Sequence, residues 1–202
     1  MGVQSIIESA RWLDALDAHG FDDVVVNLNA PPSHIADGLA YDLASFLSDA
    51  QRSRIGIEVL ESEVIVVNAR VTEALDEIRE AGLSVLIDDF GAGYSAFSYL
   101  ADLPFDTIKL DRALISGAAA QNRRASILQG IGPVFDELGI RTVAEGVETA
   151  DEFSVVRQAG VHEAQGWFIA RPAPLAQCLI DLEALAGDPA SEIRSAPSPN
   201  AP

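Results

Sequence analysis

Two adjacent carboxylates, Asp88 and Asp89, stand at the end of an apolar run and lead into the turn Gly91-Ala92-Gly93. Like charges side by side raise one another's pKa values or require a cation. At the carboxyl end of a strand, where α/β proteins bind their ligands, such a pair is typical of a divalent-metal site. Asp and Gly are also ordinary turn residues, so this stretch alone is equally compatible with an acidic turn.

The same arrangement recurs along the chain, which favours the metal site over the turn. A polar side chain stands at or near the carboxyl end of each of six strand-like segments: Asn27, Glu58, Asp88 with Asp89, Lys109, Glu145 and Gln165. Oxygen donors without Cys or His select Mg²⁺ or Mn²⁺ over zinc. Two such ions bridged by Asp88 could activate a water and stabilise an in-line attack on a phosphodiester.

The other polar residues near these strand ends have more than one interpretation. Lys109 could hold the attacking water or offset charge at phosphorus, or it could be a counter-ion for buried acids. Gln165 could orient the water or a ligand, or it could be a core amide whose hydrogen bonds are satisfied. Glu61 and Glu148 lie just past their strand ends, so we expect them to fix loops.

The strand-like segments alternate with helical ones from residue 22 onward. This alternation predicts right-handed crossovers and a parallel sheet, as in an incomplete TIM-like (β/α) barrel of about six strands with surrounding helices. We expect one such domain over residues 1–186 and a disordered tail over 187–202, which is rich in Pro, Ser and Ala. The expected strands are 24–28, 55–60, 84–88, 107–110, 141–144 and 163–169. The expected helices are 6–19, 33–48, 68–81, 95–103, 123–138, 149–159 and 175–185.

Composition narrows the possible partners. The chain has 31 Asp and Glu against 13 Lys and Arg, a net charge of −18, which argues against nucleic-acid polymers and anionic membranes as ligands. The single cysteine, Cys178, excludes an internal disulfide and a Cys-type zinc site. No apolar run reaches membrane-spanning length and no signal peptide is evident, so a soluble, cytoplasmic protein is expected. Trp12 and Trp167 are expected to serve packing rather than ligand stacking.

The motifs around these residues resemble those of the EAL-domain phosphodiesterases, which hydrolyse the bacterial second messenger cyclic di-GMP. The resemblance runs from about Ile6 to Leu179 and keeps the order and spacing of the family's motifs. The matching segments are Val26-Asn27-Leu28-Asn29, Ile57-Glu58-Val59-Leu60-Glu61, Asp88-Asp89-Phe90-Gly91-Ala92-Gly93-Tyr94-Ser95, Lys109-Leu110-Asp111-Arg112, Ala144-Glu145-Gly146-Val147-Glu148-Thr149 and Gln165-Gly166-Trp167.

The resemblance implies a modified (β/α)₈ barrel with a dinuclear Mg²⁺ or Mn²⁺ site and the linear dinucleotide pGpG as product. It further implies a homodimer, because in this family the loop from Asp89 to Ser95 couples the active site to the dimer interface. The roles it implies are metal ligation by Asn27, Glu58, Asp88, Asp89 and Glu145, catalysis by Lys109, Glu145 and Gln165, loop bracing by Glu61 and Glu148, and substrate binding by Arg112.

The chain departs from the family at one motif. The Glu-Ala-Leu motif lies on a strand upstream of every segment seen here, and Glu73-Ala74-Leu75 falls in an expected helix. With that strand we expect a metal-binding Glu, a substrate-contacting Arg and about two of the eight barrel strands to be missing. The expected consequences are impaired activity and open edges at 23–28 and 163–169. A dimer, the N-terminal helix or the rest of a longer protein could cover them.

The departure also leaves an alternative function open. Under that alternative, the chain is a catalytically inactive EAL-like module that binds cyclic di-GMP or a protein partner.

Overall fold

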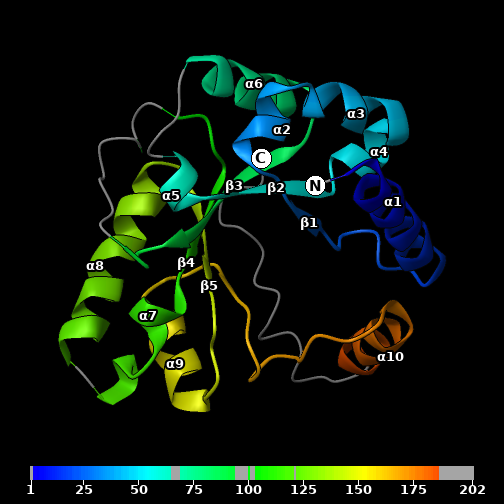
Figure 1. Cartoon of the computed structure of the whole chain (residues 1–202). Coiled ribbons are helices and arrows are strands. Elements are labelled where there is room, and N and C mark those ends of the chain that lie inside the picture. The colour runs from blue at the N-terminus through cyan, green and yellow to red at the C-terminus, as the bar shows by residue number, and fades with distance from the viewer. Residues whose placement is uncertain (1, 65–68, 94–99, 101–102, 121, 187–202) are drawn as a thin grey trace.

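Six parallel strands follow one another across a single sheet in the order in which they occur along the chain. The computed structural model of the chain describes residues 2–64, 69–93, 100, 103–120 and 122–186. The strands curve into a half-barrel with helices around it (Figure 1), which confirms the predicted incomplete TIM-like barrel. The strands are β1 (Val26–Asn29), β2 (Ile55–Leu60), β3 (Ser84–Phe90), β4 (Thr107–Leu110), β5 (Arg141–Ala144) and β6 (Glu163–Ala164).

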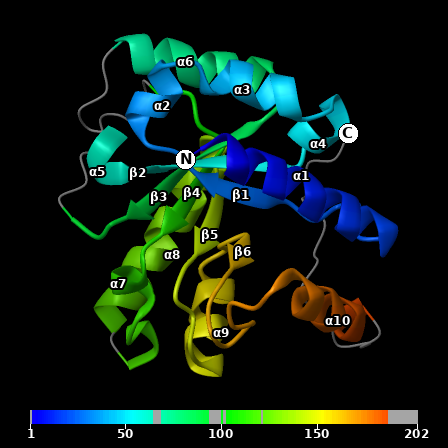
Figure 2. The same cartoon turned by 45° about the vertical axis from the view of Figure 1, so that its right-hand side comes forward.

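The connections between strands are helical and lie around the outside of the sheet (Figures 1 and 2). They are α2 (Pro32–Ala36), α3 (Leu39–Phe46) and α4 (Asp49–Arg52) after β1, α5 (Glu61–Val64) and α6 (Ala69–Glu80) after β2, α7 (Arg112–Ile115), a 3-10 helix η2 (Ala118–Ala120) and α8 (Asn122–Glu137) after β4, and α9 (Ala150–Gln158) after β5. Before β1 comes α1 (Val3–Ala18), and after β6 comes α10 (Leu175–Ala186). No helix within these described ranges is long and apolar enough to cross a membrane.

The helices attach to the sheet through apolar stripes at helical spacing. On α6, Val71, Leu75 and Ile78 are buried together, as their spacing predicts. Helix α1 packs against α3 and β1, with Leu13 and Leu16 buried. β1 and β6 each pair with one neighbour only, so the described sheet has two open edges, as expected.

Two predicted elements are shorter than expected. The helix expected at 33–48 is broken into α2 and α3, because Gly38 adopts φ +112°, a left-handed conformation that ends one helix before the next begins. The strand expected at 163–169 stops after Ala164. Beyond it the backbone of Gly166 presses against that of Val147, so close that an added Cβ would lie 2.3 Å from the Val147 carbonyl oxygen.

Other expectations cannot be compared with the structure. The helix expected at 95–103 and the tail at 187–202 lie largely or wholly outside the described residues.

The Glu73-Ala74-Leu75 triplet lies within α6, as expected, and is not part of the sheet.

Helix α8 continues through Gly130, Gly132 and Pro133, residues that are unfavourable inside a helix. Gly132 faces α9, where an added Cβ would lie 2.2 Å from the carbonyl oxygen of Ala159. Gly130, two residues earlier, has no heavy atom within 4 Å of the same position. The two glycines therefore have different roles: Gly132 lets α8 and α9 approach closely, whereas Gly130 fills no packing requirement within the described chain.

We expect Gly132→Ala to destabilise the protein by about 1–3 kcal/mol, because the added methyl collides with backbone that cannot move aside easily. Gly130→Ala serves as the matched control and should leave stability unchanged or raise it by about 0.5–1 kcal/mol, since alanine has the higher helix propensity. Urea unfolding midpoints of the two variants measure the difference. Equal midpoints would contradict the close approach of α8 and α9.

Candidate active site

A buried lysine lies at the centre of the carboxyl-terminal edge of the sheet. Lys109 is the only lysine in the sequence, and it is 4% exposed. Its Nζ lies 2.8 Å from Glu58 Oε1, 2.9 Å from Asp88 Oδ1 and 2.7 Å from Glu145 Oε1. An ammonium has three N–H donors, so these three carboxylates use its full donor capacity.

Four neighbouring strands bring these groups to one point. Glu58 lies on β2, Asp88 on β3 and Lys109 on β4, while Glu145 follows β5 directly. Because parallel strands end at the same edge, side chains near their carboxyl ends converge there. The predicted grouping of strand-end residues is therefore present in the fold, although the role of each residue stays a prediction.

Burial and charge act in opposite directions on this cluster. Burial alone would lower the pKa of the Lys109 ammonium, but hydrogen bonds to Glu145, Glu58 and Asp88 raise it well above its ordinary value. Burial raises the pKa of the Glu145 carboxyl, and the hydrogen bond and charge of Lys109 only partly oppose this. One positive charge among three acids thus leaves the cluster with an excess of negative charge.

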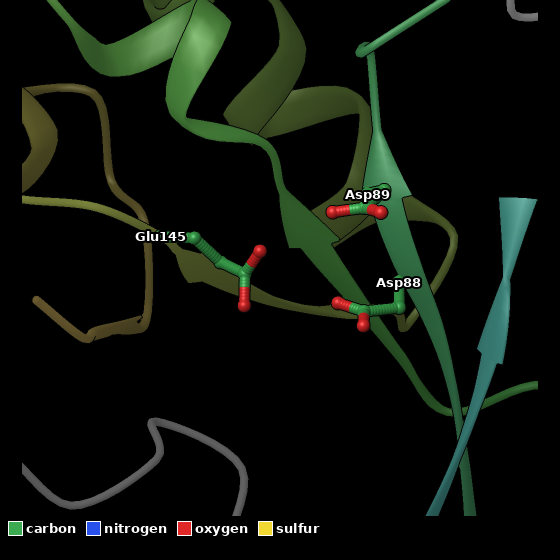
Figure 3. A group of neighbouring side chains, drawn as sticks. All are labelled: Asp88, Asp89 and Glu145. Atoms are coloured by element: carbon green, nitrogen blue, oxygen red, sulfur yellow. The ribbon is translucent and has the colours of Figure 1, made fainter. Parts of the chain in front are cut away.

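A second grouping of oxygens lies beside the lysine. Asp88, Asp89 and Glu145 each place one carboxylate oxygen within 4.8 Å of the other two. In Figure 3 their carboxylates point toward one another across the space between β3 and the segment after β5. Three hard oxygen donors this close together, without Cys or His, fit Mg²⁺ or Mn²⁺.

The backbone around Asp89 is shaped to produce this geometry. The pairing of β3 with β4 shifts register between Ile87 and Phe90, and Asp89 has φ +60°, the only positive φ outside glycine among the described residues. Asp tolerates this conformation better than most residues. Partial desolvation, followed by the charge of Asp88, raises the pKa of Asp89. The irregularity turns two successive side chains toward one site instead of opposite faces.

Asn27 lies on the neighbouring strand rather than inside the lysine cluster. It is paired with Gly56 of β2, and its Oδ1 would lie 2.3 Å from a Cβ added there. Gly56 and Glu58 are two positions apart on one strand, so they face the same side of the sheet. Asn27 therefore faces the side of the sheet on which Glu58 lies, and no described contact joins it to Asp88 or Asp89.

Gln165 is brought to the site by the edge strand β6, which it directly follows. Its Nε2 donates a hydrogen bond of 3.1 Å to Glu145 Oε1, the same oxygen that accepts from Lys109. The backbone N–H of Gln165 donates to the Ala144 carbonyl at the end of β5. This arrangement fixes how the Glu145 carboxylate is turned.

The two expected loop-bracing residues have different surroundings. Glu61 is 4% exposed and its Oε2 accepts a hydrogen bond of 3.1 Å from the backbone N–H of Gly91, at the start of the glycine turn. Glu148 instead forms an ion pair of 2.9 Å with Arg112. Glu61 thus contacts the turn that it is expected to brace, whereas Glu148 contacts a residue expected to bind substrate.

An open cavity of about 490 Å³ borders Gln165. Arg112, Glu148, Trp167 and Arg171 line it. Trp167, expected to serve packing, is 56% exposed, and the Arg171 guanidinium carbon lies 4.5 Å from its ring centroid. β6 is short, and Gly166 directly before Trp167 has φ +152°. The apolar residues around Trp167 in the sequence do not predict the exposure that results.

Comparison with known proteins identifies related sequences. The EAL domain family model matches residues 4–172. The cyclic di-GMP phosphodiesterase PA2567 of Pseudomonas aeruginosa is 38% identical over 138 residues, which are 64% of this chain and 24% of that protein. The chain spans only 18–24% of the length of this and three other curated relatives.

Solved structures with the same fold are also similar in sequence. The EAL domain of Mycobacterium smegmatis DcpA has a TM-score of 0.81 and 26% identity, over 89% of this chain and 82% of that one. Klebsiella pneumoniae BlrP1, in a complex with manganese and cyclic di-GMP, has a TM-score of 0.73 and 29% identity, over 85% and 44% of the two chains. With the fold and the clustered carboxylates, the family match over residues 4–172 shows that the chain belongs to the EAL domain family.

Proposed function

We propose that this domain hydrolyses cyclic di-GMP to linear pGpG with two bound Mg²⁺ or Mn²⁺ ions. The observation that carries the proposal is the grouping of Asp88, Asp89 and Glu145 beside Lys109 at the carboxyl-terminal edge of a half-barrel. Family membership and the relatives named as cyclic di-GMP phosphodiesterases support the choice of substrate. We further propose a cytoplasmic location, which the single cysteine supports.

The ligands would come from two adjoining sets of oxygens. Asp88, Asp89 and Glu145 would hold the ions, with Glu58 and Asn27 extending the set along β2 and β1. When bound, the ions supply Lewis-acid activation of water and of the phosphodiester. Gln165 would keep Glu145 oriented toward them through its amide hydrogen bond.

Lys109 would change partners during the reaction. All three of its donors are occupied by Glu58, Asp88 and Glu145, so it can contact a water only after one carboxylate turns away. A carboxylate that moves to a cation would release one N–H, which could then hold the attacking water. Arg112, at the edge of the cavity, would contact the substrate after leaving Glu148.

We expect turnover by these 202 residues to be slow. Their sheet contains no described strand with a Glu-Ala-Leu sequence, and the triplet at Glu73 lies in α6. One ion would therefore have one carboxylate fewer than the resemblance implies, and loss of a single transition-state contact typically costs a factor of ~10²–10³ in rate.

Incubation of the protein with cyclic di-GMP and Mn²⁺ or Mg²⁺ should yield pGpG, measured by liquid chromatography. Asp88→Asn should reduce the rate by a factor of ~10² or more, because a neutral amide holds a divalent cation more weakly than a carboxylate does. Absence of product even at stoichiometric enzyme would overturn the proposed hydrolysis. Calorimetric binding of cyclic di-GMP under those conditions would instead support the binding-module alternative.

Added Mn²⁺ should raise the unfolding temperature of the protein in the absence of nucleotide. An ion that binds only the folded state stabilises it by about 2.7 kcal/mol at a hundredfold excess over its dissociation constant. Differential scanning fluorimetry with a chelator and then with excess Mn²⁺ measures the shift. Asp88→Asn should abolish most of it, and an unchanged shift in that variant would place the metal elsewhere.

Lys109→Met should destabilise the chelator-treated protein by about 3–5 kcal/mol, because three carboxylates then lack their cation. Excess Mn²⁺ should restore more stability to this variant than it adds to the wild type. Arg112→Met is the matched control: the Arg112 side chain in its pair with Glu148 is about half exposed, so we expect a change of about 0–1 kcal/mol. Urea unfolding of both variants, with and without metal, measures their loss of stability. Equal losses of stability in the two variants would contradict the role of Lys109 as counter-ion to the three acids.

A further inference from the structure

Glu152, on the first turn of α9, accepts more hydrogen bonds than a helix cap requires. It forms a capping box with Thr149, whose side chain accepts from the Glu152 N–H while the Glu152 carboxylate accepts from the Thr149 N–H at 3.2 Å. Glu152 Oε2 also accepts from the N–H of Glu148 at 3.0 Å, and Oε1 accepts from the N–H of Gly117 at 3.2 Å. The last two bonds lie outside the capping box, and the bond to Gly117 reaches a different part of the chain.

These bonds keep the Glu152 carboxylate ionised. Burial alone would raise the pKa of Glu152, but the hydrogen bonds from the backbone N–H groups of Glu148, Gly117 and Thr149 lower it below its ordinary value. Hydrogen bonds to an ionised acceptor are roughly twice as strong as those between neutral groups. The carboxylate therefore ties its two backbone segments together strongly.

The two segments that Glu152 joins carry the two members of an ion pair at the open cavity. Gly117 follows α7, whose first residue is Arg112, and Glu148 belongs to the segment after β5. Arg112 and Glu148 line the cavity and form an ion pair of 2.9 Å. Helices α7 and α9 lie at the lower end of the molecule in Figures 1 and 2, and η2, directly after α7, packs against α9. Glu152 thus fixes the backbone on both sides of the pair.

A close contact makes the relative position of these segments matter. Gly146 has φ +64°, and a Cβ added to it would lie 2.7 Å from Cγ of Arg112. The aliphatic part of Arg112 therefore lies directly on the backbone of the segment after β5. A shift of α7 relative to that segment would move Arg112 at the cavity.

We propose that Glu152 is a positioning residue for nucleotide binding, which sets through Gly117 and Glu148 where Arg112 lies at the cavity. The inference rests on the proposed function, in which Arg112 contacts the substrate. Glu152 is not one of the described residues that line the cavity, and its described hydrogen bonds do not reach Lys109. Its effect should therefore fall on the affinity for substrate and not on the chemical step.

Glu152→Gln tests this with little change in shape. Glutamine also suits this position of a capping box, so its oxygen can still accept from Glu148 and Thr149, while its amide nitrogen then faces the Gly117 N–H. The KM for cyclic di-GMP should rise about three- to tenfold, with kcat within about twofold of the wild type, because one positioning hydrogen bond is lost. Steady-state kinetics with Mn²⁺ measures both constants. An unchanged KM, with or without a fall in kcat, would overturn the proposal.

Gln51→Ala is the matched control for loss of a helix cap. Gln51 completes the capping box of α4 with Ser48 and is not one of the described cavity residues. Its loss should lower the unfolding temperature and leave KM as in the wild type. A KM raised as much by this change as by Glu152→Gln would reduce the effect to general instability and overturn the proposal.

The double variant E152Q/R112M shows whether Glu152 acts through Arg112. If it does, the KM of the double variant should equal that of Arg112→Met alone, because the group that Glu152 positions is already absent. Increases in KM that multiply in the double variant would contradict action through Arg112.

Hydrogen exchange distinguishes failure of this inference from failure of the proposed hydrolysis. In the nucleotide-free protein, Glu152→Gln should speed exchange of the Gly117 N–H by about tenfold or more, while the Glu148 and Thr149 N–H groups keep their wild-type rates. Unchanged exchange at Gly117, measured by NMR, would overturn the inference alone. If the wild type shows no turnover, dissociation constants of cyclic di-GMP from calorimetry replace KM. A wild type with neither turnover nor binding would overturn the proposed function and, with it, the role of Glu152 in affinity.

Discussion

The balance of charge around Lys109 is the constraint on which the site depends. Three carboxylates turned inward at the end of a sheet would not stay ionised and buried without a cation, and the chain places its only lysine among them. The balance is incomplete, since one positive charge faces three acids and Asp89 lies beside them. The acids that require a lysine for folding therefore keep an excess of negative charge, which bound cations would neutralise. This excess connects the fold with the proposed metal chemistry.

The strands must end at matching levels for this balance to exist. β2 to β5 do so through regular parallel pairing, and the one irregularity, between Ile87 and Phe90, occurs where two successive carboxylates must face the same site. Two glycines leave space for side chains near the site. Gly56 of β2 allows the side chain of Asn27 to lie against its backbone, and Gly146 allows the aliphatic part of Arg112 to do the same. The edge strands β1 and β6 flank this centre: β1 pairs with β2, which carries Glu58, and Gln165, directly after β6, donates a hydrogen bond to Glu145.

The strand-end pattern predicted the sheet and the grouping of Glu58, Asp88, Lys109 and Glu145, because parallel strands bring their carboxyl ends together whatever the loops do. It could not predict details that depend on backbone contacts between distant residues. Gly38 breaks a helix that the apolar spacing made continuous, and the meeting of Gly166 with Val147 ends β6 early and exposes Trp167. The two interpretations of Lys109, as counter-ion and as water-holding group, also could not be separated by sequence. The structure pairs it with three acids, and the proposed water-holding role would require one of them to turn away.

The lone lysine also gives the protein an unusual chemical signature. Reagents that acylate amines normally modify many surface lysines, but here they would find one side-chain amine, which is 4% exposed and hydrogen-bonded three times. Its acylation requires the strand ends to separate first, so the rate of modification reports local opening of the site rather than surface accessibility. A mass spectrum taken during such labelling would thus follow the local opening of this one site.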